Sequence, residues 1–138
     1  MGFKLALTAA AALALTLPAV ASAQSVGRAI ITTYRAAPGH QVELLKWLAQ
    51  QARIAAAAGV PASQLYVHAN GDSWDYLLIA PQTTPAQDDA LEAAAKRLGL
   101  PTGPRVGIEL RKHVGSHADT LVRGPTSVRA YLAEIGEK

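Results

Sequence analysis

The sequence predicts an α+β fold in which four antiparallel strands form one sheet and two helices cover one of its faces. Short runs rich in β-branched residues alternate with longer segments whose apolar residues recur every three or four positions. Glycine, proline and helix-capping residues separate these segments. Together the patterns give the order β-α-β-β-α-β, followed by a short C-terminal helix.

The first half of this pattern consists of a strand, a helix and a hairpin. Residues 26–35 are rich in β-branched side chains and are expected to form the first strand. Residues 40–58 follow as a helix that ends at Gly59, a residue suited to the left-handed conformation there. Its expected apolar face consists of Val42, Leu45, Leu48, Ala49, Ala52 and Ala56. Residues 64–70 and 74–80 then form two strands joined by a turn.

The second helix has the clearest boundaries in the sequence. Thr84 is expected at the N-cap, Pro85 at the first helical position, and Gln87 completes a capping box. The apolar stripe of this helix ends at Leu98, and Gly99 closes it.

The last third of the chain holds one more strand and one more helix. Val106, Ile108 and Leu110 alternate with other residues, so a fourth strand is expected from residue 106 to about His113. The polar segment 113–123 is interpreted as a turn. It leads to a third helix that starts near Gly124 and has an apolar face formed by Val128, Tyr131, Leu132 and Ile135.

The N-terminal 23 residues have the form of a secretory signal peptide. Lys4 precedes an apolar run from Leu5 to Leu17, and Ala21-Ser22-Ala23 fits the cleavage rule. We therefore expect a leader over residues 1–23 and a single domain over 24–138, in a protein that is periplasmic or secreted. The apolar run is short for a membrane span, so no stable membrane anchor is expected after cleavage.

Composition excludes several classes of function. The chain has no cysteine, which rules out disulfides, thiol catalysis and cysteine-ligated metal or haem sites. The formal net charge of +3 is small, and no basic block with interleaved aromatic residues is present. No nucleic-acid partner is therefore expected.

Two of the predicted strands have apolar residues on both faces. Ile30 and Ile31 are adjacent in the first strand, and Leu77, Leu78 and Ile79 in the third. A strand of this kind is stable when both sides are covered, and helices are expected on one side only. A second copy related by a two-fold axis is the simplest cover for the other side. We therefore predict a homodimer whose sheets pack face to face.

The element order is that of the ferredoxin-like split βαβ arrangement. With the Pro-Gly in YRAAPGHQVELLKWL and the hairpin end GDSWDYLLIAP, the chain resembles the dimeric α+β barrel superfamily. Its tail, HADTLVRGPTSVRAYL, resembles an uncharacterised exported subgroup. The superfamily includes cofactor-independent monooxygenases, haem-degrading monooxygenases, isomerases and proteins of no known activity, so the resemblance implies a fold and leaves the chemistry open. The haem degraders use a histidine in the second half, whereas residues 85–98 contain none, and no cofactor is expected.

The leading functional expectation is a small, largely apolar or aromatic ligand bound in a cleft between the helices and the sheet. Pockets of this kind are commonly lined by aromatic side chains with a few polar groups. The candidate ligand-binding residues are Tyr34, Tyr66, His68, Trp74 and Tyr76. The alternative for these side chains is packing in the core and the dimer interface.

The enzymatic alternative is a cofactor-independent monooxygenase or isomerase. His117 would act as base, Asp119 would orient it, and Arg123 would steady an anionic intermediate. Asp75 is a second candidate for the orienting carboxylate. Alternatively Asp119 stabilises the turn and pairs with Arg123.

Two further alternatives remain open from the residues alone. His113, His117 and Asp119 could together ligate a metal, although no metal site is assigned. A non-enzymatic role, in which the protein interacts with another envelope protein, is also open.

Overall fold

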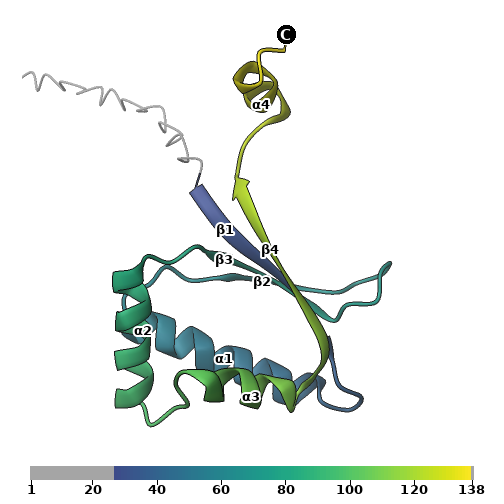
Figure 1. Cartoon of the computed structure of the whole chain (residues 1–138). Helices are drawn as coiled ribbons and strands as arrows, with labels where there is room; N and C mark the ends of the chain where they lie inside the picture. Colours follow the sequence, from purple (N-terminus) through teal and green to yellow (C-terminus); the bar gives the residue numbers. More distant parts are fainter. Residues whose placement is uncertain (1–26, 138) are drawn as a thin grey trace, which may run out of the picture.

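The protein is a four-stranded antiparallel sheet with four helices over residues 27–137, the part of the chain that the computed structural model describes (Figure 1). The strand order is β2-β3-β1-β4, and every neighbouring pair is antiparallel. This is the ferredoxin-like topology, which confirms the predicted fold class. The predicted leader, its cleavage site and the start of the first strand lie outside the described residues.

The first five elements follow the predicted order. They are β1 (Gly27–Ala36), α1 (Gln41–Ala57), β2 (Gln64–Val67), β3 (Tyr76–Pro81) and α2 (Pro85–Arg97). β2 and β3 pair as the expected hairpin. Local signals thus place these elements to within a few residues.

The ends of α1 and α2 show why these helices are predictable. The Thr84 hydroxyl accepts a hydrogen bond from the backbone N–H of Gln87, and the Gln87 side chain accepts one from the N–H of Thr84. This reciprocal capping box satisfies two N–H groups that a helix start leaves free. Gly59, just after α1, has φ +69°, a conformation that glycine adopts without steric cost.

The predicted fourth strand is wrong. Residues 104–111 form helix α3 (Pro104–Arg111), and the fourth strand is β4 (Val114–Gly124), where a polar turn was expected. In the helix, Val106 and Leu110 lie one turn apart and Leu110 is buried, while Ile108 between them is exposed. The apparent alternation is therefore a helical i, i+4 pair.

β4 is polar because it is an edge strand. It pairs with β1 through backbone hydrogen bonds from Gly27↔Gly124 to Ala36↔Val114, and its side chains are mostly exposed. A strand can thus form without an apolar pattern of its own when its neighbour supplies the ladder.

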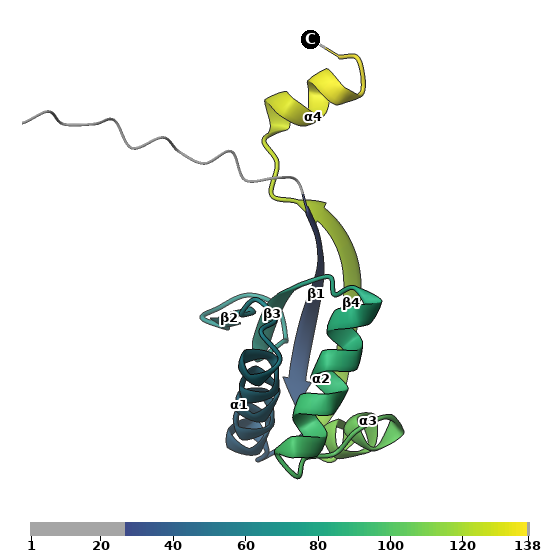
Figure 2. The same ribbon diagram turned by 90° about the vertical axis from the view of Figure 1, so that its left-hand side faces the viewer.

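Helices α1, α2 and α3 lie on one side of the sheet, here called the helix side (Figure 2). The main core joins the sheet to α1 and α3, and its buried residues are Tyr34, Ala36, Leu44, Leu48, Tyr76 and Leu110. A smaller cluster of Ile54, Ala94 and Ala95 joins α1 to α2. The buried face of α1 is rotated from the predicted one, since Leu44 is fully buried whereas Val42 is exposed.

The opposite side of the sheet, here called the open face, carries no helix within the part of the chain that the structure describes (Figure 2). The strand register gathers on it Ala29, Ile31, Thr33, Tyr66, Leu77, Ile79, Ala118, Thr120 and Val122. Most of these side chains are aliphatic, and none is charged. The register also places Gln64, Pro81 and Ser116 on the open face, and Arg35 at one end of it. The open face is the surface for which the sequence predicted a second copy.

The C-terminal segment extends away from the rest of the fold (Figures 1 and 2). Helix α4 (Val128–Glu134) follows β4, close to the predicted third helix, and none of its residues is buried. None of the helices within residues 27–137 combines the length and the apolar character needed to cross a membrane.

Candidate functional site

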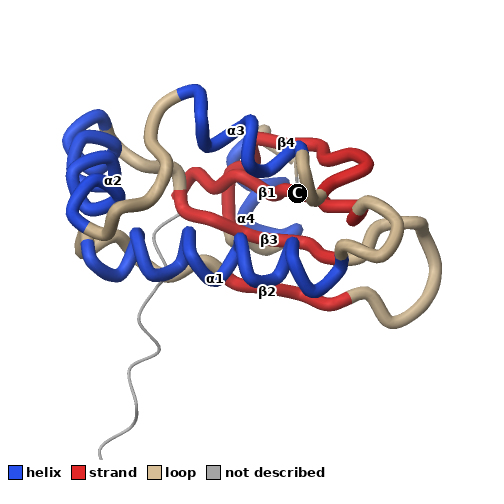
Figure 3. Tube along the Cα trace, turned by 90° about the horizontal axis from the view of Figure 1, so that it is seen from below, coloured by secondary structure: helices blue, strands red, loops and turns tan. Residues whose placement is uncertain are grey.

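An apolar hollow lies between α1 and the β2 edge of the sheet, and we call it the α1–β2 groove. Figure 3 shows α1 running along β2 and β3. The hollow has a volume of about 480 Å³. It is lined by Leu45, Leu48, Ala49, Gln51, Ala52, Ala55, Ala56, Val60, Ala62, Ser63, Leu65 and Leu78. Its size falls in the range of small-molecule pockets, about 300–1,000 Å³.

The sequence of α1 explains why this hollow exists. Ala49, Ala52 and Ala56 are spaced by three and four residues, so they lie on one side of the helix. Their methyl groups are too short to fill the space down to Leu65 and Leu78 of the sheet. These alanines were predicted as part of a packed apolar face, and they line a hollow instead.

The groove offers almost no polar chemistry. Among residues 27–137, Gln51 and Ser63 are its only polar lining side chains, and no charged side chain lines it. The site can therefore bind through apolar contact with one or two hydrogen bonds, and it contains no acid or base that could move a proton.

The predicted ligand-binding aromatic residues do not line this groove. Tyr34 and Tyr76 are buried in the core, and the hydroxyl of Tyr76 donates to the carbonyl of Gln41 at 3.3 Å. Tyr66 lies on the open face and is half exposed. His68 and Trp74 pack edge to face, 4.9 Å between ring centroids, beside the hairpin loop. The packing interpretation thus describes these side chains better than a shared ligand site.

His117 and Asp119 do lie together, on the helix side of β4. The His117 Nε2 atom is 3.8 Å from Asp119 Oδ2, and the imidazole stacks with Tyr34 at 6.2 Å between centroids. The other carboxylate oxygen of Asp119 accepts a hydrogen bond of 2.7 Å from the Thr32 hydroxyl. Burial raises the pKa of Tyr34; the bond with Thr32 opposes this shift and the charge of Asp119 adds to it.

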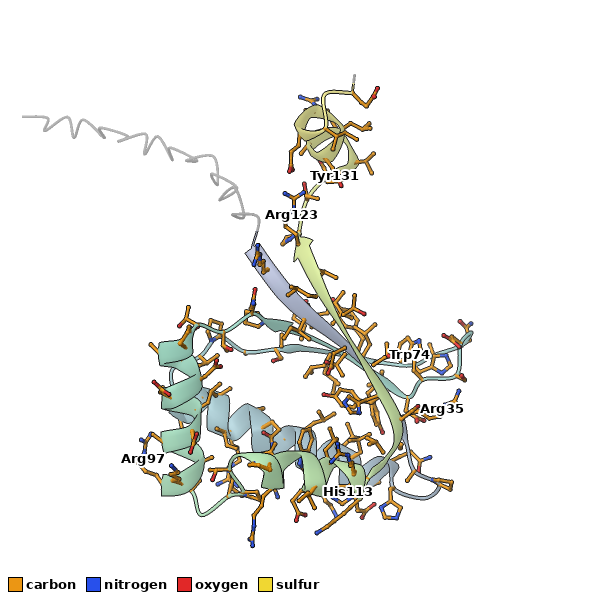
Figure 4. All side chains as sticks on the ribbon, in the orientation of Figure 1. Arg35, Trp74, Arg97, His113, Arg123 and Tyr131 are labelled. Atoms are coloured by element: carbon orange, nitrogen blue, oxygen red, sulfur yellow. The ribbon has the colours of Figure 1, made fainter. Side chains whose placement is uncertain are left out.

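Arg123 does not join this pair. It lies further along β4, about 20 Å from His117 by the rise of an extended strand. Its Nη1 is 2.6 Å from Glu134 Oε1, and its guanidinium stands over the Tyr131 ring at 5.6 Å (Figure 4). The expected pairing of Arg123 with Asp119 is therefore wrong, and the three predicted catalytic residues do not converge.

The remaining polar candidates have structural partners or lie apart. Asp75 accepts a 2.7 Å hydrogen bond from the buried N–H of Ala36 and so holds the end of β1. His113 sits between α3 and β4, 5.8 Å from the ring of His40. Within residues 27–137 no three histidine or carboxylate side chains are grouped closely enough to hold a metal ion.

A second, more polar hollow lies at one end of the open face. It has a volume of about 400 Å³, and Arg35 and Trp74 are among its lining residues (Figure 4). His117 also lines it, so this hollow brings one predicted catalytic residue together with one predicted ligand-binding residue, Trp74. The Nε of Arg35 donates to the carbonyl of Ser73 at 2.6 Å, and its Nη2 donates to the Ser73 hydroxyl. These bonds fix the guanidinium against the hairpin loop.

Comparisons with known proteins found similarity to solved structures only. No model of a protein family matches the chain, and no curated protein is similar enough in sequence to count as a relative. SnoaB, a cofactor-independent oxygenase from Streptomyces nogalater solved as a mutant, is similar in structure. It has a TM-score of 0.49 and 19% identity over 73% of this chain and 95% of that one.

Two other solved structures are similar to a lower degree. A dimeric protein of unknown function with a ferredoxin-like fold from Bacteroides fragilis has a TM-score of 0.42 and 17% identity, over 70% of this chain and 95% of that one. An uncharacterised NIPSNAP domain protein from Burkholderia xenovorans has a TM-score of 0.43 and 14% identity, over 73% of this chain and 96% of that one. The fold assignment rests on the strand order itself.

Proposed function

We propose that this chain is an exported, homodimeric α+β barrel protein that binds a small apolar ligand in the α1–β2 groove. The observation that carries the proposal is the groove itself. The groove is open to water, since Ala52 and Ala56 of α1 and Leu65 of β2 are exposed along it, and a hollow of about 480 Å³ with exposed apolar walls is the kind of surface at which ligands bind. Filling it with an apolar molecule removes aliphatic surface from water, which is the main driving force for such binding.

The lining defines the class of ligand. Because it has no charge and only two polar side chains, an ionised molecule would lose hydration there without compensation. The expected ligand is uncharged and aliphatic or aromatic, with at most one or two groups that bond to Gln51 or Ser63.

The open face supports the dimer. Its central positions, Ile31, Leu77 and Ile79, form an aliphatic patch that none of the described helices covers. Contiguous apolar surface of this kind marks an association site, and a second copy with the same surface is self-complementary about a two-fold axis. The location outside the cytosol follows from the predicted leader.

A fluorescence titration tests the ligand proposal. N-phenyl-1-naphthylamine is uncharged and brightens in apolar surroundings, and we expect saturable binding to the purified protein. Ala52→Trp places an indole in the groove and should abolish the signal. Ala93→Trp on the exposed surface of α2 is the matched control and should leave it unchanged. Equal binding by Ala52→Trp and the unmodified protein, with both folded, would refute the assignment.

Sedimentation tests the dimer. Ile31→Lys puts a charge at the centre of the open face, where the strand register aligns it with Ile79. We expect the unmodified chain to sediment as a dimer and this variant as a folded monomer. Val42→Lys, on an exposed position of α1, is the control and should remain dimeric.

A second candidate function is proton abstraction by His117. The observation in its favour is the contact of His117 with Asp119 beside the ring of Tyr34. It predicts that the protein exchanges solvent deuterium into an activated keto or aromatic compound, and that His117→Ala loses this exchange. Exchange no faster than in buffer, over a panel of such compounds, would exclude it.

A further inference from the structure

Helix α4 presents an apolar side that no segment within residues 27–137 covers. Val128, Leu132 and Ile135 are spaced by four and three residues, and Val128 is 80% exposed. The helix itself is seven residues long, capped by a 3.1 Å hydrogen bond from the N–H of Ala130 to the Ser127 hydroxyl. A helix this short is not stable alone in water, so its apolar side needs a packing surface.

The position of α4 is fixed relative to β4. Arg123 bonds Glu134 and stands over Tyr131, which ties the helix to the strand that precedes it. Arg123 shares its side of β4 with His117 and Asp119, and this is the helix side of the sheet. The strand itself, however, carries α4 beyond the end of the sheet and away from the layer that contains α1, as Figures 1 and 4 show for α4, Arg123 and Tyr131.

The surface that α4 would fit best, the α1–β2 groove, is out of reach in the same chain. β4 and β2 form opposite edges of the sheet and are separated by three strand spacings, about 14 Å. In Figures 1 and 2 α4 lies well away from α1. The groove and the apolar side of α4 are thus two unpartnered apolar surfaces at different edges of one molecule.

A face-to-face dimer brings these two surfaces together. The strand register places Gln64, Ile79, Ile31 and Thr120 in one row across the sheet. A two-fold axis parallel to the strands does not shift residues along the strand direction, so each row faces the same row of the partner. The rotation exchanges the two edges of the sheet, so β4 lies beside the partner's β2 and runs antiparallel to it. The end of β4 then lies at the end of the sheet where the partner's β2 begins, next to the groove residues that precede that strand.

The side chains along that edge agree with this placement. Leu121 of β4 is 58% exposed and Leu65 of β2 is 44% exposed. Both lie on the helix side of their strands. In the dimer both side chains would lie on the outer side of the seam between β4 and the partner's β2, along the path from the end of β4 to the mouth of the groove.

We propose that the C-terminal arm, residues 121–137, crosses to a second copy, so that α4 of each subunit closes the α1–β2 groove of the other. The inference rests on the proposed homodimer and adds to it: each ligand site is completed by the partner. The occupant is a second copy because the arm leaves the fold on the side of the sheet where that copy would lie (Figures 1 and 2), and because the end of the strand and the apolar chemistry match there.

Cysteine cross-linking tests the arm directly, because the chain has no cysteine of its own. Val128→Cys on α4 and Ala62→Cys at the groove are purified as separate variants, unfolded together, refolded and mildly oxidised. A disulfide forms only when the two Cα atoms come within about 7 Å. We expect a linked species of twice the chain mass from the mixture and none from either variant alone. Val128→Cys mixed with Glu92→Cys on exposed α2 is the control and should give none.

The outcomes separate the arm from the dimer. If the mixture sediments as a dimer and no link forms, the arm proposal fails and the dimer stands. If the chain sediments as a monomer, the dimer and the arm both fail. A link within one chain carrying both substitutions would show that α4 covers its own groove, and a link between two Val128→Cys chains would show that α4 pairs with α4. Either result overturns the proposal.

Discussion

The hydrogen bond between Thr32 and Asp119 allows a quantitative test of the role of Asp119. Thr32 lies in β1 and is only 6% exposed, and its hydroxyl donates to Asp119 Oδ1 at 2.7 Å. Asp119→Ala removes the acceptor and leaves a hydroxyl that is shielded from water without a partner. We therefore expect this substitution to lower stability.

The expected loss follows from the surroundings of the two groups. A hydrogen bond to a charged group contributes about 1.5–3 kcal/mol, and stranding a buried polar group costs about 1–3 kcal/mol. The Asp119 side chain is 58% exposed, so solvent screens its charge and the lower half applies, about 1–2 kcal/mol. For a domain of this size that lowers Tm by about 4–10 °C. His117→Ala removes a partly exposed ring and a 3.8 Å contact, with an expected loss of about 0.5 kcal/mol.

A double-mutant cycle measured by urea unfolding isolates the pair. Thr32→Val removes the donor and leaves an Asp119 carboxylate that water can still solvate, so its cost should be smaller than that of Asp119→Ala. In the double variant no buried hydroxyl is stranded, and the total loss should fall below the sum of the single losses. Additive losses, or a loss from Asp119→Ala no larger than from His117→Ala, would refute the reasoning.

Three further predictions concern particular elements. Gly107→Ala should stabilise α3 by about 0.5–1 kcal/mol in chemical denaturation, because the residue is inside a helix and an added Cβ meets no atom within 4 Å. Thr84→Ala should lower stability by about 0.5–2 kcal/mol through loss of the α2 capping box, whereas Thr126→Ala, outside any helix, should not. Burial raises the pKa of Tyr34, so the folded protein keeps the phenol proton at a pH where the unfolded chain, with a pKa near 10, loses it. The contribution of Tyr34 to the free energy of unfolding is therefore fully present below pH 10 and declines as the pH rises beyond it. Tyr34→Phe should flatten this alkaline decline in thermal melts.

The elements that the sequence predicts well are those whose ends carry their own chemistry. The capping box at Thr84 and Gln87 and the glycine after α1 act through neighbouring residues, so their effect does not depend on the rest of the fold. The hairpin of β2 and β3 is likewise joined by a local turn. The bounds of these elements are therefore predicted correctly to within a few residues even where the predicted tertiary packing is wrong.

The fourth strand was misplaced because apolar periodicity reports burial, not backbone conformation. β4 takes its hydrogen bonds from β1 and buries little, so nothing in its side chains distinguishes it from a polar loop. In α3 the reverse occurred, because Val106, Ile108 and Leu110 also fit one turn of a helix in which Ile108 faces outward. Pro104 at the first turn was the local signal in favour of the helix.

The sequence predicted that a cleft would lie between helix and sheet, but it did not predict which side chains line the cleft. A cleft between helix and sheet was expected, and one exists, but alanines and leucines line it and the predicted aromatic residues do not. The signal was the repeat of small residues on α1 at Ala49, Ala52 and Ala56, which leaves space that larger side chains would fill. Whether such space becomes a pocket depends on the distance to Leu65 and Leu78, and this is a tertiary property.

The two sides of β4 differ in a way that bears on the whole proposal. The helix side of the strand carries His117, Asp119, Leu121 and Arg123, of which Asp119 and Arg123 are charged, whereas the open face carries Ser116, Ala118, Thr120 and Val122, none of them charged. A strand exposed to water on both sides has no reason to keep charge off one of them. Depletion of charge is the compositional mark of the centre of a protein interface. The same depletion continues across β1 and β3, and Arg35 enters only at the end of the open face, where it is bonded to the hairpin loop. The uncharged side of β4 therefore belongs to the same surface as Ile31 and Ile79, which is the surface a second copy would cover.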